Sequence, residues 1–142
     1  MKWKILFLSV CITVASLTAH GATAKGVVFQ DSNGNQVRDA GEAGIPDVLV
    51  SNGENVVKTN AKGKYRLSVG KDTILFVCKP KGWMTPVDEN NVPRFYYIHK
   101  PGGSPELTYK GVAPTGPLPK SVDFPLTAHP ETTQFKALFF GD

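Results

Sequence analysis

The clearest structural signal in the chain is Asn60-Ala61-Lys62-Gly63-Lys64-Tyr65-Arg66-Leu67-Ser68-Val69, a polar turn followed by a strictly alternating segment. In a β-strand successive side chains point to opposite faces, so this alternation predicts a strand of an antiparallel sheet with one face buried. We expect Tyr65, Leu67 and Val69 to face the core. We also expect the turn to close a hairpin with a strand at residues 55–59.

The rest of the chain consists of short apolar runs separated by turns, and no segment has helical periodicity. Asn52-Gly53 lies between two valine-rich runs, which is typical of a β-hairpin. We expect β-strands at residues 26–30, 48–52, 55–59, 64–69, 73–79, 95–99, 107–111, 122–126 and 135–140. The pattern therefore predicts an all-β fold, an antiparallel β-sandwich.

The N-terminus has the organisation of a secretory signal peptide. Lys2 and Lys4 precede an apolar run at residues 5–17, and Ala22-Thr23-Ala24 offers a small-residue cleavage site. We expect residues 1–24 to be removed and the protein to be secreted, to the periplasm or the cell surface. Because Lys2 and Lys4 would leave with a segment that contains no acidic residue, the net charge of +4 would fall to +2. That balance gives no case for a nucleic-acid or membrane surface, and we expect no transmembrane segment after cleavage.

Cysteine usage argues against both disulfides and thiol chemistry. The chain has two cysteines, and Cys11 lies in the segment that we expect to be removed. In the strand expected at residues 73–79, Cys78 alternates with Ile74 and Phe76. We therefore expect Cys78 to be a small core residue rather than a nucleophile, and we expect stability to come from the hydrophobic core.

Residues 80–119 are rich in proline and glycine, so we expect much of this region to form extended loops. It also carries large aromatic side chains, Trp83 and the run Phe95-Tyr96-Tyr97. Two interpretations stay open for them. They either pack on a partner surface within the same polypeptide or close one end of the sandwich.

The acidic loop at residues 31–42 has the oxygen spacing of a calcium loop. Side chains that could bind the ion occupy its first, third, fifth, ninth and twelfth positions, and the seventh position would offer a backbone carbonyl. These residues are Asp31, Asn33, Asn35, Val37, Asp39 and Glu42. The glycine expected at the sixth position is Gln36, so curling would need a different backbone path. The alternative is a polar turn in which Asn33-Gly34 supplies the positive φ.

A resemblance to a known family supports the interpretation of residues 31–42 as a calcium loop. Residues 26–31, 33–35, 39–48 and 59–65 together resemble the B-type repeats of bacterial surface adhesins. Those repeats are prealbumin-like or immunoglobulin-like sandwiches, often with calcium in the acidic loop. The resemblance therefore implies an immunoglobulin-like or prealbumin-like sandwich and a bound calcium ion.

The remainder resembles the N-terminal module of secreted calcineurin-like metallophosphoesterases. The segments that carry this resemblance are Arg94-Phe95-Tyr96-Tyr97, Gly102-Gly103-Ser104-Pro105, and residues 121–126 and 134–142. In that family the module precedes the catalytic domain. The resemblance implies a sandwich at residues 25–128, with a long Pro-rich extension, and then a linker and the first strand of a truncated catalytic domain at residues 129–142. Asp142 would ligate one of two divalent metals in a full-length enzyme.

We therefore expect a module without catalysis of its own, which packs on the catalytic domain of a phosphoesterase in the same polypeptide. One alternative is a calcium-stabilised adhesin stalk module. Another is a carbohydrate-binding sandwich that uses Trp83, Tyr96 and Tyr97 as stacking platforms.

Overall fold

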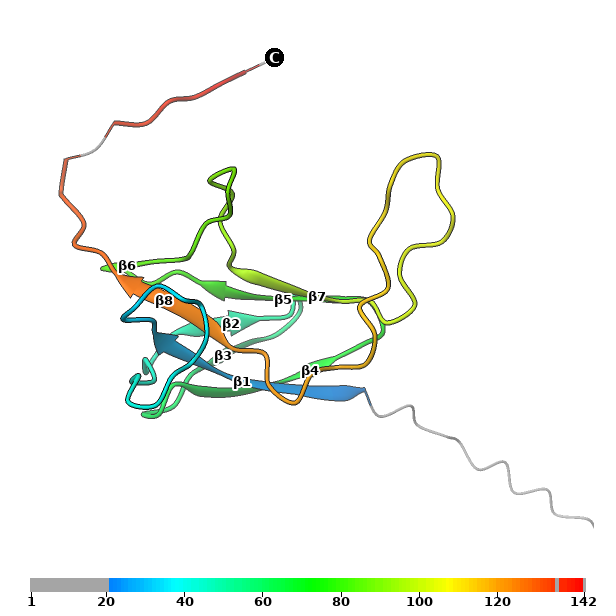
Figure 1. Ribbon diagram of the computed structural model, residues 1–142, viewed down its shortest axis with the longest axis horizontal. Coiled ribbons are helices and arrows are strands. Elements are labelled where there is room, and N and C mark those ends of the chain that lie inside the picture. Colours follow the sequence, from blue (N-terminus) through cyan, green and yellow to red (C-terminus); the bar gives the residue numbers. More distant parts are fainter. Residues whose placement is uncertain (1–20, 135, 142) are drawn as a thin grey trace, which may run out of the picture.

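The computed structural model describes residues 21–134 and 136–141. Eight strands form two four-stranded sheets, with the orders β4-β1-β8-β6 and β3-β2-β5-β7 (Figure 1). Their bounds are β1 (Ala22–Gln30), β2 (Leu49–Ser51), β3 (Val56–Lys58), β4 (Lys64–Val69), β5 (Thr73–Cys78), β6 (Trp83–Met84), β7 (Tyr96–His99) and β8 (Phe124–Ala128). The described residues contain no helix, so the predicted all-β sandwich is confirmed. All strand pairs are antiparallel except β1 and β8, which run parallel.

The alternating segment at β4 behaves as predicted. Tyr65, Leu67 and Val69 are buried, and the residues between them are exposed. β4 pairs with β1 over six residues, from Ala22 opposite Val69 to Val27 opposite Lys64. β1 begins at Ala22, so cleavage after Ala24 would fall inside this strand. Residues 1–20 of the expected signal peptide lie outside the described residues.

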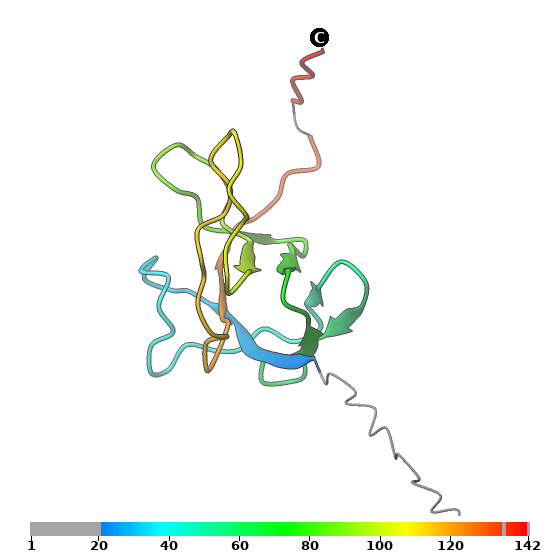
Figure 2. The ribbon, with the colours of Figure 1, turned by 90° about the vertical axis from the view of Figure 1, so that its right-hand side faces the viewer.

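The core lies between the two sheets, which surround it when the molecule is viewed from the end (Figure 2). The largest side chains that are fully buried are Phe29, Leu75, Leu126, Val28, Val48 and Val50. Each contributes about 1.5 to 3 kcal/mol relative to an exposed side chain. Tyr65 satisfies its polar end by donating from its hydroxyl to the carbonyl of Val122 at 2.7 Å. The core therefore consists of apolar contacts, and the polar end of Tyr65 is hydrogen-bonded.

The two expected hairpins have different outcomes. β2 and β3 pair antiparallel around Asn52-Gly53, as predicted. The prediction of a hairpin between β3 and β4 is wrong, because β3 pairs with β2 in one sheet while β4 pairs with β1 in the other. Asn60 still organises a turn, since its side-chain oxygen accepts from the backbone N–H groups of Lys62 and Lys64. This turn carries the chain from one sheet to the other.

Three further predictions about strands and faces need correction. Residues 107–111 form no strand, and Tyr109 is 85% exposed. The described part of the strand expected at residues 135–140, which begins at 136, is also not a strand. Cys78 is exposed rather than buried, because β5 turns Leu75 and Val77 inward and presents Ile74, Phe76 and Cys78 outward.

Two loops leave the sandwich on the same side. In Figures 1 and 2 the segment between β6 and β7 and the longer segment between β7 and β8 both rise on one side of the molecule, as does the C-terminal segment. Residues 100–123 contain no strand. No helix among the described residues has the length and apolar character needed to cross a membrane.

Candidate functional site

The acidic loop begins where β1 ends, and its first carboxylate is fixed by the backbone. Asp31 is only 3% exposed, and its N–H donates to the carbonyl of Leu126 in β8 at 2.9 Å. Its two carboxylate oxygens accept from the N–H groups of Gly34, at 2.7 Å, and Gln36, at 2.9 Å. Asp31 therefore ties the start of the loop both to the sheet and to the next turn.

The other predicted ligands meet in two groups. Asp39 Oδ2 accepts from the side-chain amides of Asn33 and Asn35, both at 2.8 Å. The carboxylate of Glu42 accepts from the N–H of Ser32 at 2.9 Å and from the N–H of Asp39 at 3.0 Å. The loop thus brings the side chains of Asn33, Asn35 and Asp39 together, and Glu42 connects the two ends of the loop through its hydrogen bonds.

Gln36 answers the question of how this loop curls without the expected glycine. Its φ is 63°, in the left-handed region that glycine adopts most easily. Val37 then donates its N–H to the side-chain oxygen of Asn35 at 2.8 Å, which continues the curl. The loop therefore curls at its sixth position because Gln36 itself adopts the strained, left-handed conformation that glycine adopts more easily. Sequence reasoning could not find this, because a positive φ at glutamine has no sequence signature.

The donor set fits a hard cation in its chemistry, since carboxylate and amide oxygens are the ligands that calcium prefers. In this structure, however, the oxygens of Asp31, Asp39 and Glu42 accept from N–H groups of the loop. No group of three His, Cys, Asp or Glu side chains is placed to hold a metal ion within residues 21–134 and 136–141. A bound ion would take over the role that the amide N–H groups of Asn33 and Asn35 play beside Asp39. Asp142 lies outside the described residues.

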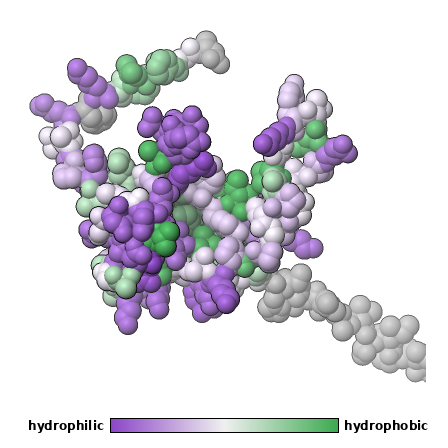
Figure 3. Space-filling view, viewed as in Figure 1, coloured by the Kyte–Doolittle hydropathy of each residue, from purple (hydrophilic) through white to green (hydrophobic). Residues whose placement is uncertain are grey.

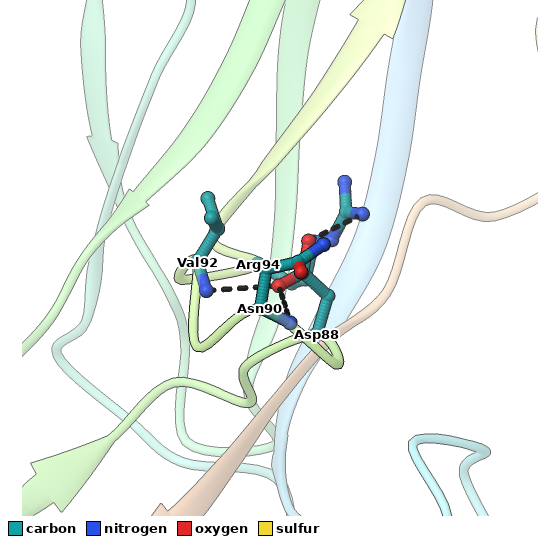
Figure 4. Close-up of polar contacts among 4 residues, drawn as sticks. All are labelled: Asp88, Asn90, Val92 and Arg94. Atoms are coloured by element: carbon teal, nitrogen blue, oxygen red, sulfur yellow. Dashed lines mark hydrogen bonds and ion pairs between the residues drawn. The ribbon is translucent and has the colours of Figure 1, made fainter.

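A second polar cluster organises the loop between β6 and β7 (Figure 4). Asp88 Oδ1 accepts from the N–H groups of Val92 and Asn90, both at 2.9 Å, and Oδ2 lies 2.9 Å from Arg94 Nη2. The hydrogen bond from Val92 is the main reason that the pKa of Asp88 is lowered, with further contributions from Asn90 and Arg94. Sequence reasoning missed this cluster, although an Asp followed by Asn90-Asn91 is a turn signal.

A cleft of about 310 Å³ lies beside this loop, at the edge where β7 of one sheet faces β8 of the other. Arg94, Tyr96 and Tyr97 line one side, and Asp123 and Phe124 line the other. The cleft places the aromatic run beside the segment that leads into β8.

The aromatic side chains proposed as sugar platforms are dispersed. Trp83 lies in β6 of the first sheet, and Tyr96 and Tyr97 lie in β7 of the second. Trp83 and Tyr97 are partly buried against the core, as expected if these side chains close one end of the sandwich. Tyr96 is 38% exposed and packs edge to face on Phe95, with ring centroids 5.4 Å apart. The carbohydrate-binding alternative stays a prediction.

The outer face of the β3-β2-β5-β7 sheet is largely apolar, although Ser51 and Lys58 also lie on it, and sequence reasoning missed it. We call this surface the outer apolar face, and it consists of Leu49, Val56, Ile74, Phe76, Cys78, Tyr96 and Ile98. Ile74 lies opposite Ile98, and Phe76 lies opposite Tyr96. The signal was present in β5, where Ile74-Leu75-Phe76-Val77-Cys78 is apolar at every position and so has two apolar faces.

The C-terminal segment starts close to this face and then stands away from the domain. The N–H of His129 donates to the carbonyl of Gly82 at 2.8 Å, and Lys79, the residue after Cys78, lies 2.5 Å from the carboxylate of Glu131. The hydrogen bond from Lys79 lowers the pKa of Glu131. Beyond this anchor, Leu138, Phe139 and Phe140 are 84 to 93% exposed. Figure 3 shows apolar surface in this segment, which stands away from the body of the domain.

No curated protein and no solved structure matches the chain. The sequence does match the family described as "N terminal of Calcineurin-like phosphoesterase" over residues 30–110, which is more than half of its length. The match runs from the end of β1 through the acidic loop, β2 to β7 and the Asp88 loop. The chain therefore belongs to the family of N-terminal modules of calcineurin-like phosphoesterases.

Proposed function

We propose that this chain is the non-catalytic N-terminal module of a secreted calcineurin-like phosphoesterase, and that it packs on the catalytic domain of the same polypeptide. The observation that carries the proposal is the outer apolar face. An antiparallel sheet with one face in water normally alternates apolar and polar residues, as β4 does. Here the face turned away from the core carries the seven residues of the outer apolar face, together with Ser51 and one charged residue, Lys58, at its β3 edge. A contiguous surface of this kind is typical of an interaction site.

The position of the C-terminal segment supports the choice of the catalytic domain as the partner. The anchor between Lys79 and Glu131 lies next to Cys78, at one end of the outer apolar face. About ten further residues lead to Gly141, and an extended chain advances about 3.3 Å per residue. A domain that follows this segment is therefore tethered within about 30 Å of the face, which gives it a high effective concentration there.

The exposed apolar side chains of the same segment point to its role. Leu138, Phe139 and Phe140 are highly exposed here, and a partner surface would bury them. On this proposal residues 135–140 form a strand of the catalytic domain, and Asp142 is one of the ligands of two divalent metals in that domain. Such a pair of ions would stabilise the attacking and leaving oxygens of a phosphate ester.

The accessible thiol on the outer apolar face gives a direct test of the packing. In the 142-residue chain Cys78 is exposed and should react readily with a thiol reagent such as dithionitrobenzoate. In the polypeptide that continues into the phosphoesterase domain, reaction at Cys78 should be strongly slowed. Cys78→Ser identifies the signal from this thiol in both. Equal reaction rates at Cys78 in the two polypeptides would contradict packing at this face.

The proposal that this module is not catalytic has a test of its own. The 142-residue chain should show no hydrolysis of p-nitrophenyl phosphate with or without Mn²⁺, because its described residues place no cluster of ligands for two metals. Metal-dependent turnover by this chain would refute a non-catalytic role.

We also propose that the acidic loop binds calcium and thereby stabilises the module. Its support is the convergence of Asn33, Asn35 and Asp39, together with the left-handed φ of 63° at Gln36, where calcium loops have glycine. Binding to the native state alone stabilises it by about 2.7 kcal/mol at a hundredfold excess over Kd. The midpoint of thermal unfolding should therefore rise in millimolar calcium and fall back with a chelator.

Two variants make the calcium test specific. Glu42→Gln should abolish the calcium-dependent rise, because it removes the charge of the proposed bidentate ligand. Ser32→Ala should leave the rise intact, because only the backbone N–H of Ser32 takes part in the loop. An unchanged midpoint of the unmodified chain in millimolar calcium would sink the proposal.

A further inference from the structure

We propose that the cleft between β1, β3 and β4 binds a small phosphate-bearing molecule. Its volume is about 540 Å³, within the range of ligand sites in proteins. Six of its lining residues carry the argument: Lys25, Lys58, Asn60, Lys64, Arg66 and Ser121. The site lies on the β1-β4 sheet and the neighbouring edge strand β3, away from β5 and β7 (Figure 1), so it meets the outer apolar face only at the β3 edge.

The register places like charges side by side on this sheet. Lys25 in β1 lies directly opposite Arg66 in β4. Lys64 is two residues from Arg66 along the same strand, so both side chains lie on the same face. Like charges directly opposite each other in a sheet destabilise it. The fold tolerates this arrangement in water, and a bound anion would convert it into a favourable one.

Carboxylates do little to neutralise these cations. Among the described residues only Lys58 of the four cations makes an ion pair, with Asp47 at 3.6 Å, and both side chains are well exposed. Exposed pairs of this kind contribute little. Asp123 follows the lining residue Ser121 by two positions, and its Oδ1 accepts from the N–H of Val27 at 2.7 Å and from Ser121 Oγ at 2.6 Å. Lys25, Lys64 and Arg66 therefore keep their charge available at the cleft.

The donor types select the ligand. A guanidinium presents its N–H groups in a fork that matches two oxygens of a phosphate, and the lysines add point charges. A phosphate group offers several oxygens that could bridge Lys25 and Arg66 across the two strands. Three cations on one face of the β1-β4 sheet, with Lys58 on the neighbouring edge strand, suit a small anion, whereas a nucleic acid would need an extended basic stripe.

The test is a titration of the 142-residue chain, followed by the amide signals of the ¹⁵N-labelled protein. Inorganic phosphate, pyrophosphate and glycerol phosphate are added separately, each against sodium chloride at the same ionic strength, because screening alone shifts signals of charged residues. We expect saturable shifts at Lys25, Lys64 and Arg66 with the phosphate compounds and none with chloride. Tighter binding of glycerol phosphate than of inorganic phosphate would assign the site to phosphate esters, and the reverse order to the free ion.

Two kinds of variant decide the outcome. Arg66→Gln should weaken binding by about tenfold or more, the loss expected for a charge-assisted bidentate contact. Lys71→Gln and Lys110→Gln, which change exposed lysines outside the cleft, should leave the affinity unchanged. Arg66→Gln should also keep or raise the thermal midpoint, because it removes a like-charge pair. No saturable binding up to about 50 mM, or binding that Arg66→Gln leaves intact, would overturn the proposal. Neither result bears on the packing of the other sheet.

Discussion

Gly63 shows how a single residue allows two backbone segments to approach closely. Its φ is +71°, and a Cβ there would lie 2.3 Å from the carbonyl oxygen of Val28. The carbonyl of Gly63 also accepts from the N–H of Val28 at 2.9 Å, so the turn after β3 is bonded directly to β1. A side chain at this position would separate the two backbones.

We therefore expect Gly63→Ala to lower the free energy of unfolding by about 2 to 4 kcal/mol, from the left-handed backbone and the displaced contact together. Denaturant unfolding measures this loss. Gly116→Ala is the matched control, because Gly116 has a φ of +70° with nothing within 4 Å of its Cβ position. It should cost only the backbone strain, about 1 kcal/mol. Equal losses in the two variants would contradict the role given to the Val28 contact.

At the scale of the elements, the sequence predicts a strand best where only one of its faces is buried. β4 has a single apolar face, so its alternation predicts both the strand and the residues that enter the core. β5 is apolar on both faces, and the sequence alone does not say which set enters the core, so the prediction that Cys78 lies in the core is wrong. The turn after β3 carries ordinary hairpin residues, Asn60 and Gly63, and nothing local distinguishes a hairpin from a connection between sheets. In each failure the deciding contact lies far along the chain.

The loop between β6 and β7 allows a pH prediction at this scale. Asp88 has a lowered pKa, so its hydrogen bonds to Val92 and Asn90 stabilise the loop above the unfolded pKa of about 3.9 and are lost as the pH falls through the lower folded pKa. The amide signals of Asn90 and Val92 should titrate with a midpoint below that of an ordinary aspartate. Asp88→Asn should remove this titration. A midpoint at or above the ordinary value would contradict the lowered pKa.

At the scale of the whole molecule, one face of β5 stabilises the sandwich, and we expect the other face to contact the catalytic domain. Leu75 is fully buried between the sheets, whereas its neighbour Ile74 is 50% exposed on the outer apolar face. Both belong to one strand, and both can be replaced by threonine, whose β-branched side chain is suited to a strand. The pair therefore distinguishes a residue that the sandwich needs from one that only a partner needs.

In the isolated chain, Leu75→Thr should lower the free energy of unfolding by about 2 to 5 kcal/mol, because it places a hydroxyl and a cavity in the core. Ile74→Thr should change it by no more than about 0.5 kcal/mol, as surface substitutions usually do. Denaturant unfolding followed by tryptophan fluorescence measures both. In the polypeptide that includes the phosphoesterase domain, Ile74→Thr should raise the reactivity of Cys78, because it weakens the packing that covers this thiol. An Ile74→Thr chain that unfolds as readily as Leu75→Thr would show that the outer apolar face serves the sandwich itself, and the docking role would lose its foundation.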